Sequence, residues 1–175
     1  DLSAPANDTT RPTFHESGGV RWVEFDGVND ILHRLAALNL YDAGSFTLAV
    51  AGRFNPAAIG NTFFSEGNSA TSNPTFQFVS GNTGVANLAS QWRSFDGGTV
   101  ILNPGSTLAV DALNNSDKVL IVTDNGSQVT AYADGVAGTT RNYTRSGALG
   151  MNRFALGANI RTSIQNYMAG RYHAF

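Results

Sequence analysis

The sequence contains no cysteine and few charged residues, and both shortages narrow its possible functions. Without cysteine the chain can form no disulfide, no thiolate metal site and no cysteine nucleophile. Charged residues make up 14% of the chain, and the formal net charge is −2. A small negative net charge does not provide the basic surface that binds the phosphates of DNA or RNA. We therefore expect oxygen and nitrogen chemistry and no nucleic-acid partner.

Long apolar runs are also missing. No stretch reaches the length of a membrane span, and no signal peptide opens the chain. We therefore expect no membrane partner, and any targeting information would lie outside these residues. The lack of cysteine also favours a bacterial or viral surface protein over a small animal ectodomain.

What the sequence does contain is typical of an all-β domain. Its 19 glycines and 10% aromatics suit short strands joined by tight turns. Residues 1–19 are polar and irregular, which predicts an N-terminal arm or loop. The spacing and turn composition of residues 20–175 predict one domain, a two-sheet sandwich or a barrel. The predicted strands span residues 20–26, 31–34, 45–54, 62–65, 75–80, 86–94, 99–102, 118–124, 127–134, 153–160 and 166–175.

The clearest local signal is the Asn-Gly at 125–126, which lies between two alternating apolar runs. It predicts a hairpin with a type I′ turn, because both turn residues need positive φ. That register sets Val122 against Val129, on an apolar face shared with Leu120 and Ala131. The opposite face carries Gln128, Thr130 and Tyr132, so one side of the hairpin is predicted to be core and the other half-exposed.

The order of several motifs carries a resemblance. They are "VRWVEFDGVNDIL", "SFTLAVAGRFNP", "FFSEGN" with "TFQFV", "DKVLIVTDNGSQVTAYADGV" and "NRFALGANIRTSIQNYMAGRYHAF". Together they resemble the laminin G-like, concanavalin A-like lectin/glucanase superfamily, in the branch found in bacterial surface and bacteriophage virion proteins. The resemblance implies a jelly roll of two antiparallel sheets, and both ends look cut from a longer polypeptide.

The resemblance also implies a calcium ion at the sandwich rim, held by oxygen ligands. The candidates lie in Asx-rich loops: Asn29, Asp30, Asp124 with its neighbour Asn125, and Asn159. Each also has a simpler reading, because Asx side chains favour turns by capping local backbone groups. The hairpin alone explains Asp124.

Carbohydrate binding needs aromatic faces beside planar polar groups. Trp92 with Arg93, and Tyr132 with Gln128, supply that chemistry and are our predicted ligand residues. For Trp22 we favour a place in the core, as for most tryptophans in sandwiches.

Catalysis is not expected. The superfamily's glycoside hydrolases use a strand reading Glu-x-Asp-x-x-Glu, since a nucleophile and an acid must project from one sheet face. Here Glu24 and Asp26 are followed by Asn29 where the third carboxylate should stand. The contexts of His15, His33 and His173 suggest no triad or metal motif.

These observations favour a non-catalytic recognition or adhesion module of an extracellular, cell-surface or virion-surface protein, binding a glycan or host receptor. The alternative is a decoration or assembly domain that contacts other virion or surface-protein subunits, with homo-oligomers as one form. A glycoside hydrolase is the third hypothesis. A receptor module should expose its aromatic residues, whereas an assembly domain should hide them in contacts.

Overall fold

The computed structural model describes residues 2–3, 8–55, 62–72, 75–80, 89–96, 99–100, 107–111, 115–144 and 148–174, with side chains left out at 8, 79–80, 89–96, 99–100, 107–111 and 174. The elements within these ranges are η1 (Asp8–Thr10), β1 (Thr13–Ser17), β2 (Val20–Asp26), β3 (Leu32–Arg34), β4 (Phe46–Phe54), β5 (Thr62–Gly67), β6 (Thr75–Ser80), β7 (Ala89–Asp96), β8 (Thr99–Val100), β9 (Thr107–Asp111), β10 (Asp117–Asp124), β11 (Gln128–Ala133), β12 (Val136–Ala137), β13 (Arg141–Asn142), β14 (Arg153–Leu156) and β15 (Ala169–Ala174).

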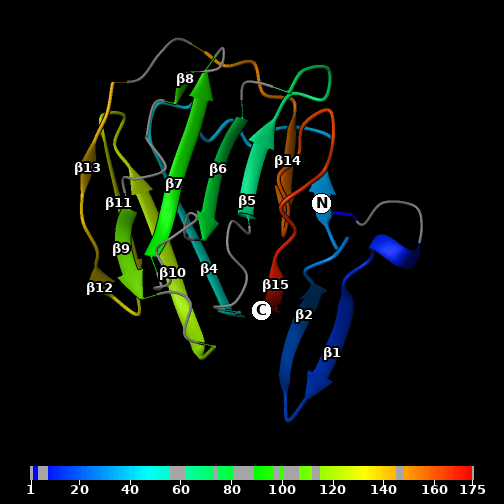
Figure 1. Cartoon of the computed structure of the whole chain (residues 1–175). Helices are drawn as coiled ribbons and strands as arrows, with labels where there is room; N and C mark the ends of the chain where they lie inside the picture. Colours follow the sequence, from blue (N-terminus) through cyan, green and yellow to red (C-terminus); the bar gives the residue numbers. More distant parts are fainter. Residues whose placement is uncertain are drawn as a thin grey trace.

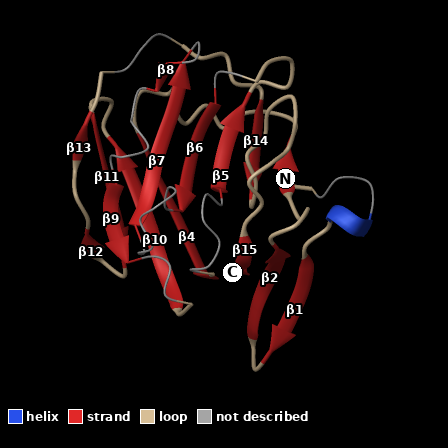
Figure 2. Ribbon diagram, viewed as in Figure 1, coloured by secondary structure: helices blue, strands red, loops and turns tan. Residues whose placement is uncertain are grey.

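The strands form two antiparallel sheets that pack face to face as a jelly-roll β-sandwich, which confirms the predicted fold class (Figures 1 and 2). One sheet has the order β1-β2-β15-β4-β10-β11-β12, with β13 also paired to β11. The other has the order β3-β14-β5-β6-β7-β8, with β9 paired to β7. Within the described ranges, no helix has the length and apolar character to cross a bilayer.

Aromatic side chains dominate the core between the sheets. Phe54 of the first sheet meets Phe63 of the second edge to face, with ring centroids 4.7 Å apart. Tyr172 lies beside Phe54 and donates its buried hydroxyl to the carbonyl of Phe63. Because burial disfavours the phenolate, it raises the pKa of Tyr172 far above its usual range. The last strand is thus fixed to both sheets from the inside.

A second, smaller apolar cluster covers the outer face of the β3-β14-β5 sheet. Phe154 belongs to the main core, whereas its neighbour Ala155 packs with Ile31, Ala158 and Ile160. Successive strand residues point to opposite faces, so this second cluster lies outside the sandwich. Ser65 holds the covering loop by donating to the carbonyl of Ala158 and accepting from the amide of Ile160.

The N-terminal region differs from its prediction. Thr13–Ser17, expected within an arm or loop, forms β1 and pairs antiparallel with β2. The β1–β2 hairpin extends below the ends of the other strands in Figure 1. Phe14 and Val20 on this hairpin are 58% and 50% exposed. Since β1 buries neither face fully, its sequence does not alternate between apolar and polar residues as a half-buried strand would.

The hairpin around Asn125 exists, but its turn is not type I′. Asp124 pairs with Val129 and Val122 with Ala131, a shift of two positions from the predicted register. Gly126 has positive φ, whereas Asn125 does not. Instead, the side-chain oxygen of Asn125 accepts from the amide of Gln128 at 2.8 Å. A two-residue shift keeps every side chain on its predicted face, so Leu120 and Val122 are buried as expected.

Candidate functional site

The outer face of the β4-β10-β11 region carries a row of hydroxyl groups. Thr123 of β10 pairs with Thr47 of β4 on one side and with Thr130 of β11 on the other. Residues directly opposite on neighbouring strands have side chains about 5 Å apart, so the three threonines form a line across the sheet. Their hydroxyls face outward because the even-numbered neighbours in β10 point into the core.

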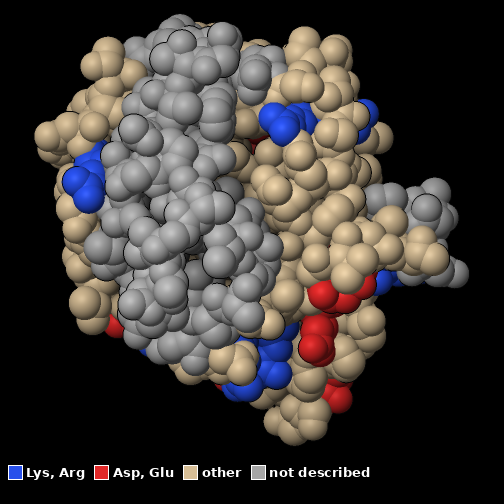
Figure 3. Space-filling model, in the orientation of Figure 1, with Lys and Arg blue, Asp and Glu red and all other residues tan. Residues whose placement is uncertain are grey.

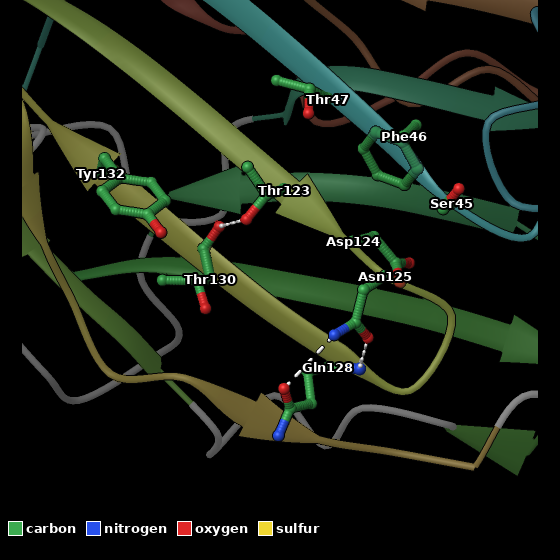
Figure 4. A pocket seen from close by; sticks show the side chains of 9 residues that line it. All are labelled: Ser45, Phe46, Thr47, Thr123, Asp124, Asn125, Gln128, Thr130 and Tyr132. Atoms are coloured by element: carbon green, nitrogen blue, oxygen red, sulfur yellow. Dashed lines mark hydrogen bonds between the residues drawn. The ribbon is translucent and has the colours of Figure 1, made fainter.

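Tyr132 and Gln128 flank this row on β11 and complete an open depression of about 540 Å³ (Figure 4). Tyr132 is half-buried and lies two residues after Thr130 in β11, on the same face of the sheet. Gln128 accepts from the Asn125 amide at 3.3 Å and donates to Asn142 at 2.9 Å, which fixes its orientation. The depression thus combines one aromatic ring with several fixed hydrogen-bonding groups.

Asp124 forms part of the wall at the hairpin tip. Asp124 is 3% exposed, and both of its carboxylate oxygens accept hydrogen bonds. One accepts from the amide of Gly126 at 2.7 Å and the other from the Tyr143 hydroxyl at 2.6 Å. This sequence-predicted calcium candidate is therefore already bonded as an anchor for the turn.

A network of charged groups lies further along the same face. Asp117 of β10 accepts from Arg53 at 2.9 Å and from Arg171 at 3.0 Å, and His173 is 3.0 Å away. The Arg53 guanidinium, followed by His173 and Arg171, holds the pKa of Asp117 well below its usual range. The network joins β10, β4 and β15 across the sheet.

Trp22 belongs to this outer face, which corrects its predicted place in the core. Its ring stacks on His15 with centroids 5.1 Å apart, and the Arg171 guanidinium lies 5.0 Å from the ring centroid. Val23 and Phe25, its neighbours in β2, are the residues that pack inward. The alternation of β2 carried this signal, because Trp22 shares a face with Glu24.

The four predicted ligand residues divide between the two sheets. Gln128 and Tyr132 lie together in the depression, whereas Trp92 and Arg93 belong to β7 of the other sheet. The side chains of Trp92 and Arg93 lie outside the described residues. Sequence reasoning missed Thr47 and Thr123, because their place in the site follows from the pairing of β4 with β10.

The calcium candidates do not form one site. Asp124 pairs with Phe46 at one end of β4, whereas the β2–β3 turn that holds Asn29 and Asp30 follows Asp26, near the Phe54 end. Those ends are eight residues apart, about 26 Å at strand rise. Asp124 is therefore too far from Asn29 and Asp30 to share one ion with them. In the portion of the chain that the structure describes, no group of three or more His, Asp or Glu could hold a metal.

Local hydrogen bonds account for the two acidic candidates, Asp30 and Asp124. Asp30 accepts from the amide of Asp26 at 2.8 Å, and burial raises the pKa of Asp30. Asn29 and Asn159 each keep a buried side-chain oxygen for which the described residues supply no hydrogen bond.

Glu24 and Asp26, the residues closest to a glycosidase strand, are also engaged locally. Glu24 lies 3.2 Å from His15, and Asp26 accepts from the amides of Val28 and Asn29 to form a turn. On the side drawn in Figure 3, acidic and basic side chains lie next to one another near the lower edge. This mixture of positive and negative side chains differs from the continuous basic surface that is typical of nucleic-acid-binding proteins.

Comparison with known proteins supports the fold. No family model and no curated protein matches the sequence. Among solved structures, the CBM40 carbohydrate-binding module of the Ruminococcus gnavus IT-sialidase has a TM-score of 0.58 and 16% identity, covering 77% of this chain and 75% of the module. Domains LG4-5 of the mouse laminin α1 chain have a TM-score of 0.59 and 12% identity, covering 98% of this chain and 44% of theirs.

The alginate lyase Aly36B also matches, with a TM-score of 0.58 and 11% identity, covering 99% of this chain and 84% of the lyase. Binding modules and an enzyme thus share this architecture. At these identities the likeness establishes that the chain has a lectin-like jelly-roll fold, which hosts several functions.

Proposed function

We propose that this domain is a non-catalytic glycan-recognition module of an extracellular, cell-surface or virion-surface protein, with its site in the depression between β4, β10 and β11. The observation that carries the proposal is the half-buried Tyr132 beside the row of Thr47, Thr123 and Thr130. A sugar presents an apolar ring face together with hydroxyls. An aromatic ring next to fixed hydrogen-bonding groups complements both.

The carbohydrate-binding module and laminin domains of the same fold support a binding role. Catalysis has no comparable support, since Glu24 and Asp26 are held by neighbouring groups. The proposal therefore relies on the geometry of the depression.

The test is binding of the purified domain to a broad glycan array, with Tyr132→Ala as the site variant. Phe14→Ala is a matched control, because it also removes an exposed aromatic ring but from the β1–β2 hairpin. We expect Tyr132→Ala to weaken binding at least about tenfold and Phe14→Ala to leave it unchanged. Running the array with calcium and with a chelator tests the ion at the same time. A folded protein that binds no glycan would contradict the proposal.

One observation favours assembly with other subunits as a second function. The β1–β2 hairpin projects from the sandwich and exposes Phe14 and Val20 (Figure 1). Phe14 belongs to β1, the edge strand of its sheet, and an exposed apolar side chain on an edge strand is a feature that proteins usually cover or blunt. Light scattering after size-exclusion chromatography tests this directly. A dimer that Phe14→Ala dissociates would support assembly, whereas a monomer at high concentration would oppose self-assembly.

A further inference from the structure

The charge of the side chains that line the depression indicates which kind of sugar it can bind. Of the nine described residues that line it, only Asp124 carries a charged side chain, and that side chain is acidic. The others offer hydroxyls, amides and the ring of Tyr132, since the ring of Phe46 packs against Phe76 in the core. We infer, on the basis of the proposed function, that the depression binds neutral, hydroxyl-rich glycans and discriminates against sugars that carry a carboxylate or sulfate.

Hydrogen-bond chemistry supports a neutral ligand. A threonine hydroxyl both donates and accepts, and the side-chain amides of Asn125 and Gln128 do the same. Sugar hydroxyls have this same dual character. Thr123 already donates to the carbonyl of Thr130, and the Thr130 hydroxyl bonds with that of Thr140, so a sugar hydroxyl would use the remaining acceptor and donor positions of the row. An anionic group instead needs donors that compensate its lost hydration, and the cost of burying it is high without a cation.

Arg53 and Arg171, the basic residues described around Asp117 on the same face, lie too far away to supply that compensation. Arg53 is six residues from Thr47 along β4, about 20 Å at strand rise. Exposed charges are largely screened beyond the Debye length, which is about 8 Å at physiological salt. Arg53 and Arg171 are also both bonded to Asp117. Their positive charge is therefore committed to a carboxylate at the other end of the sheet.

The experiment compares matched glycans on the array that differ by a single carboxylate or sulfate, at low and at high salt. We expect the neutral member of each pair to bind at least about tenfold more tightly. Its binding should change little with salt and should be lost in Tyr132→Ala. A second variant, Thr47→Lys, places a cation at the edge of the depression, where Thr47 is exposed. This variant should raise the binding of the acidic members relative to the neutral ones.

The outcomes separate this inference from the proposed function. Acidic glycans that bind best and are lost in Tyr132→Ala would overturn the neutral selectivity while leaving glycan recognition at this site intact. Binding that survives Tyr132→Ala, or no binding by folded protein, would overturn the site itself and the inference with it.

Discussion

The hydroxyl of Tyr143 donates a hydrogen bond of 2.6 Å to the carboxylate of Asp124. Asp124 is 3% exposed and ends β10, while Tyr143 follows the short edge strand β13. The other oxygen of Asp124 holds the amide of Gly126 in the adjoining turn. This pair therefore connects the hairpin tip, which forms one wall of the depression, to the edge of the sheet.

Replacing Tyr143 by phenylalanine should lower the free energy of unfolding by about 1.5–3 kcal/mol, because hydrogen bonds to charged groups contribute that much. Urea denaturation would measure the loss. Tyr132→Phe is the control, since within the described residues no hydrogen bond to the Tyr132 hydroxyl is seen and we expect a change near zero. Equal effects of the two substitutions would contradict an anchoring role for the Tyr143 hydroxyl.

The network around Asp117 should make stability depend on acidity. Its cationic neighbours lower the pKa of Asp117 in the folded state, so the unfolded chain binds the proton more readily. The resulting stabilisation is fully present above the unfolded pKa of about 3.9 and is lost as the pH falls toward the lower folded pKa. Asp117→Asn should therefore cost stability at pH 7, by about 1 kcal/mol or less because the site is half-exposed to solvent.

Urea denaturation of wild type and Asp117→Asn across the acid range measures this effect. The difference between the two proteins should shrink steadily below pH 4 and should also shrink at high salt. A difference that stays constant with pH would mean that the aspartate acts through packing rather than through its charge.

Strand positions could be predicted from the sequence because alternation and turn residues are local signals. Thr75–Ser80 was predicted with its observed bounds, and β10 and β4 differ from their predictions by one residue. The hairpin register was wrong because Asn125 caps the turn with its side chain, a choice that the Asn-Gly dipeptide alone does not reveal. Strand β1 was missed because an exposed edge strand has little reason to alternate.

The site depends on pairings that no local pattern encodes. Tyr132 and Gln128 could be proposed together because two positions along one strand share a face. The contribution of Thr47 depends on β4 lying beside β10, although about 70 residues separate them in the chain. Trp92 was grouped with Tyr132 by chemistry alone, and the topology places the two in different sheets.

Gly157 offers a test of the packing between the sheets. Its φ is +81°, and a Cβ added there would overlap the ring of Phe25, which is 2% exposed in the core. Gly157→Ala should therefore combine backbone strain of about 1–2 kcal/mol with overpacking of about 1–3 kcal/mol. We expect a loss of about 2–5 kcal/mol in the free energy of unfolding, measured by urea denaturation.

Gly135 separates the two contributions to that loss. Its φ is also +81°, but a Cβ added there would meet no atom within 4 Å. Gly135→Ala should thus show the backbone strain alone and lose only about 1–2 kcal/mol. The excess loss in Gly157→Ala then measures how tightly Phe25 is held against the loop after β14. If the two variants lost the same stability, Phe25 would have room to move aside, and the close packing of β2 on this loop would be wrong.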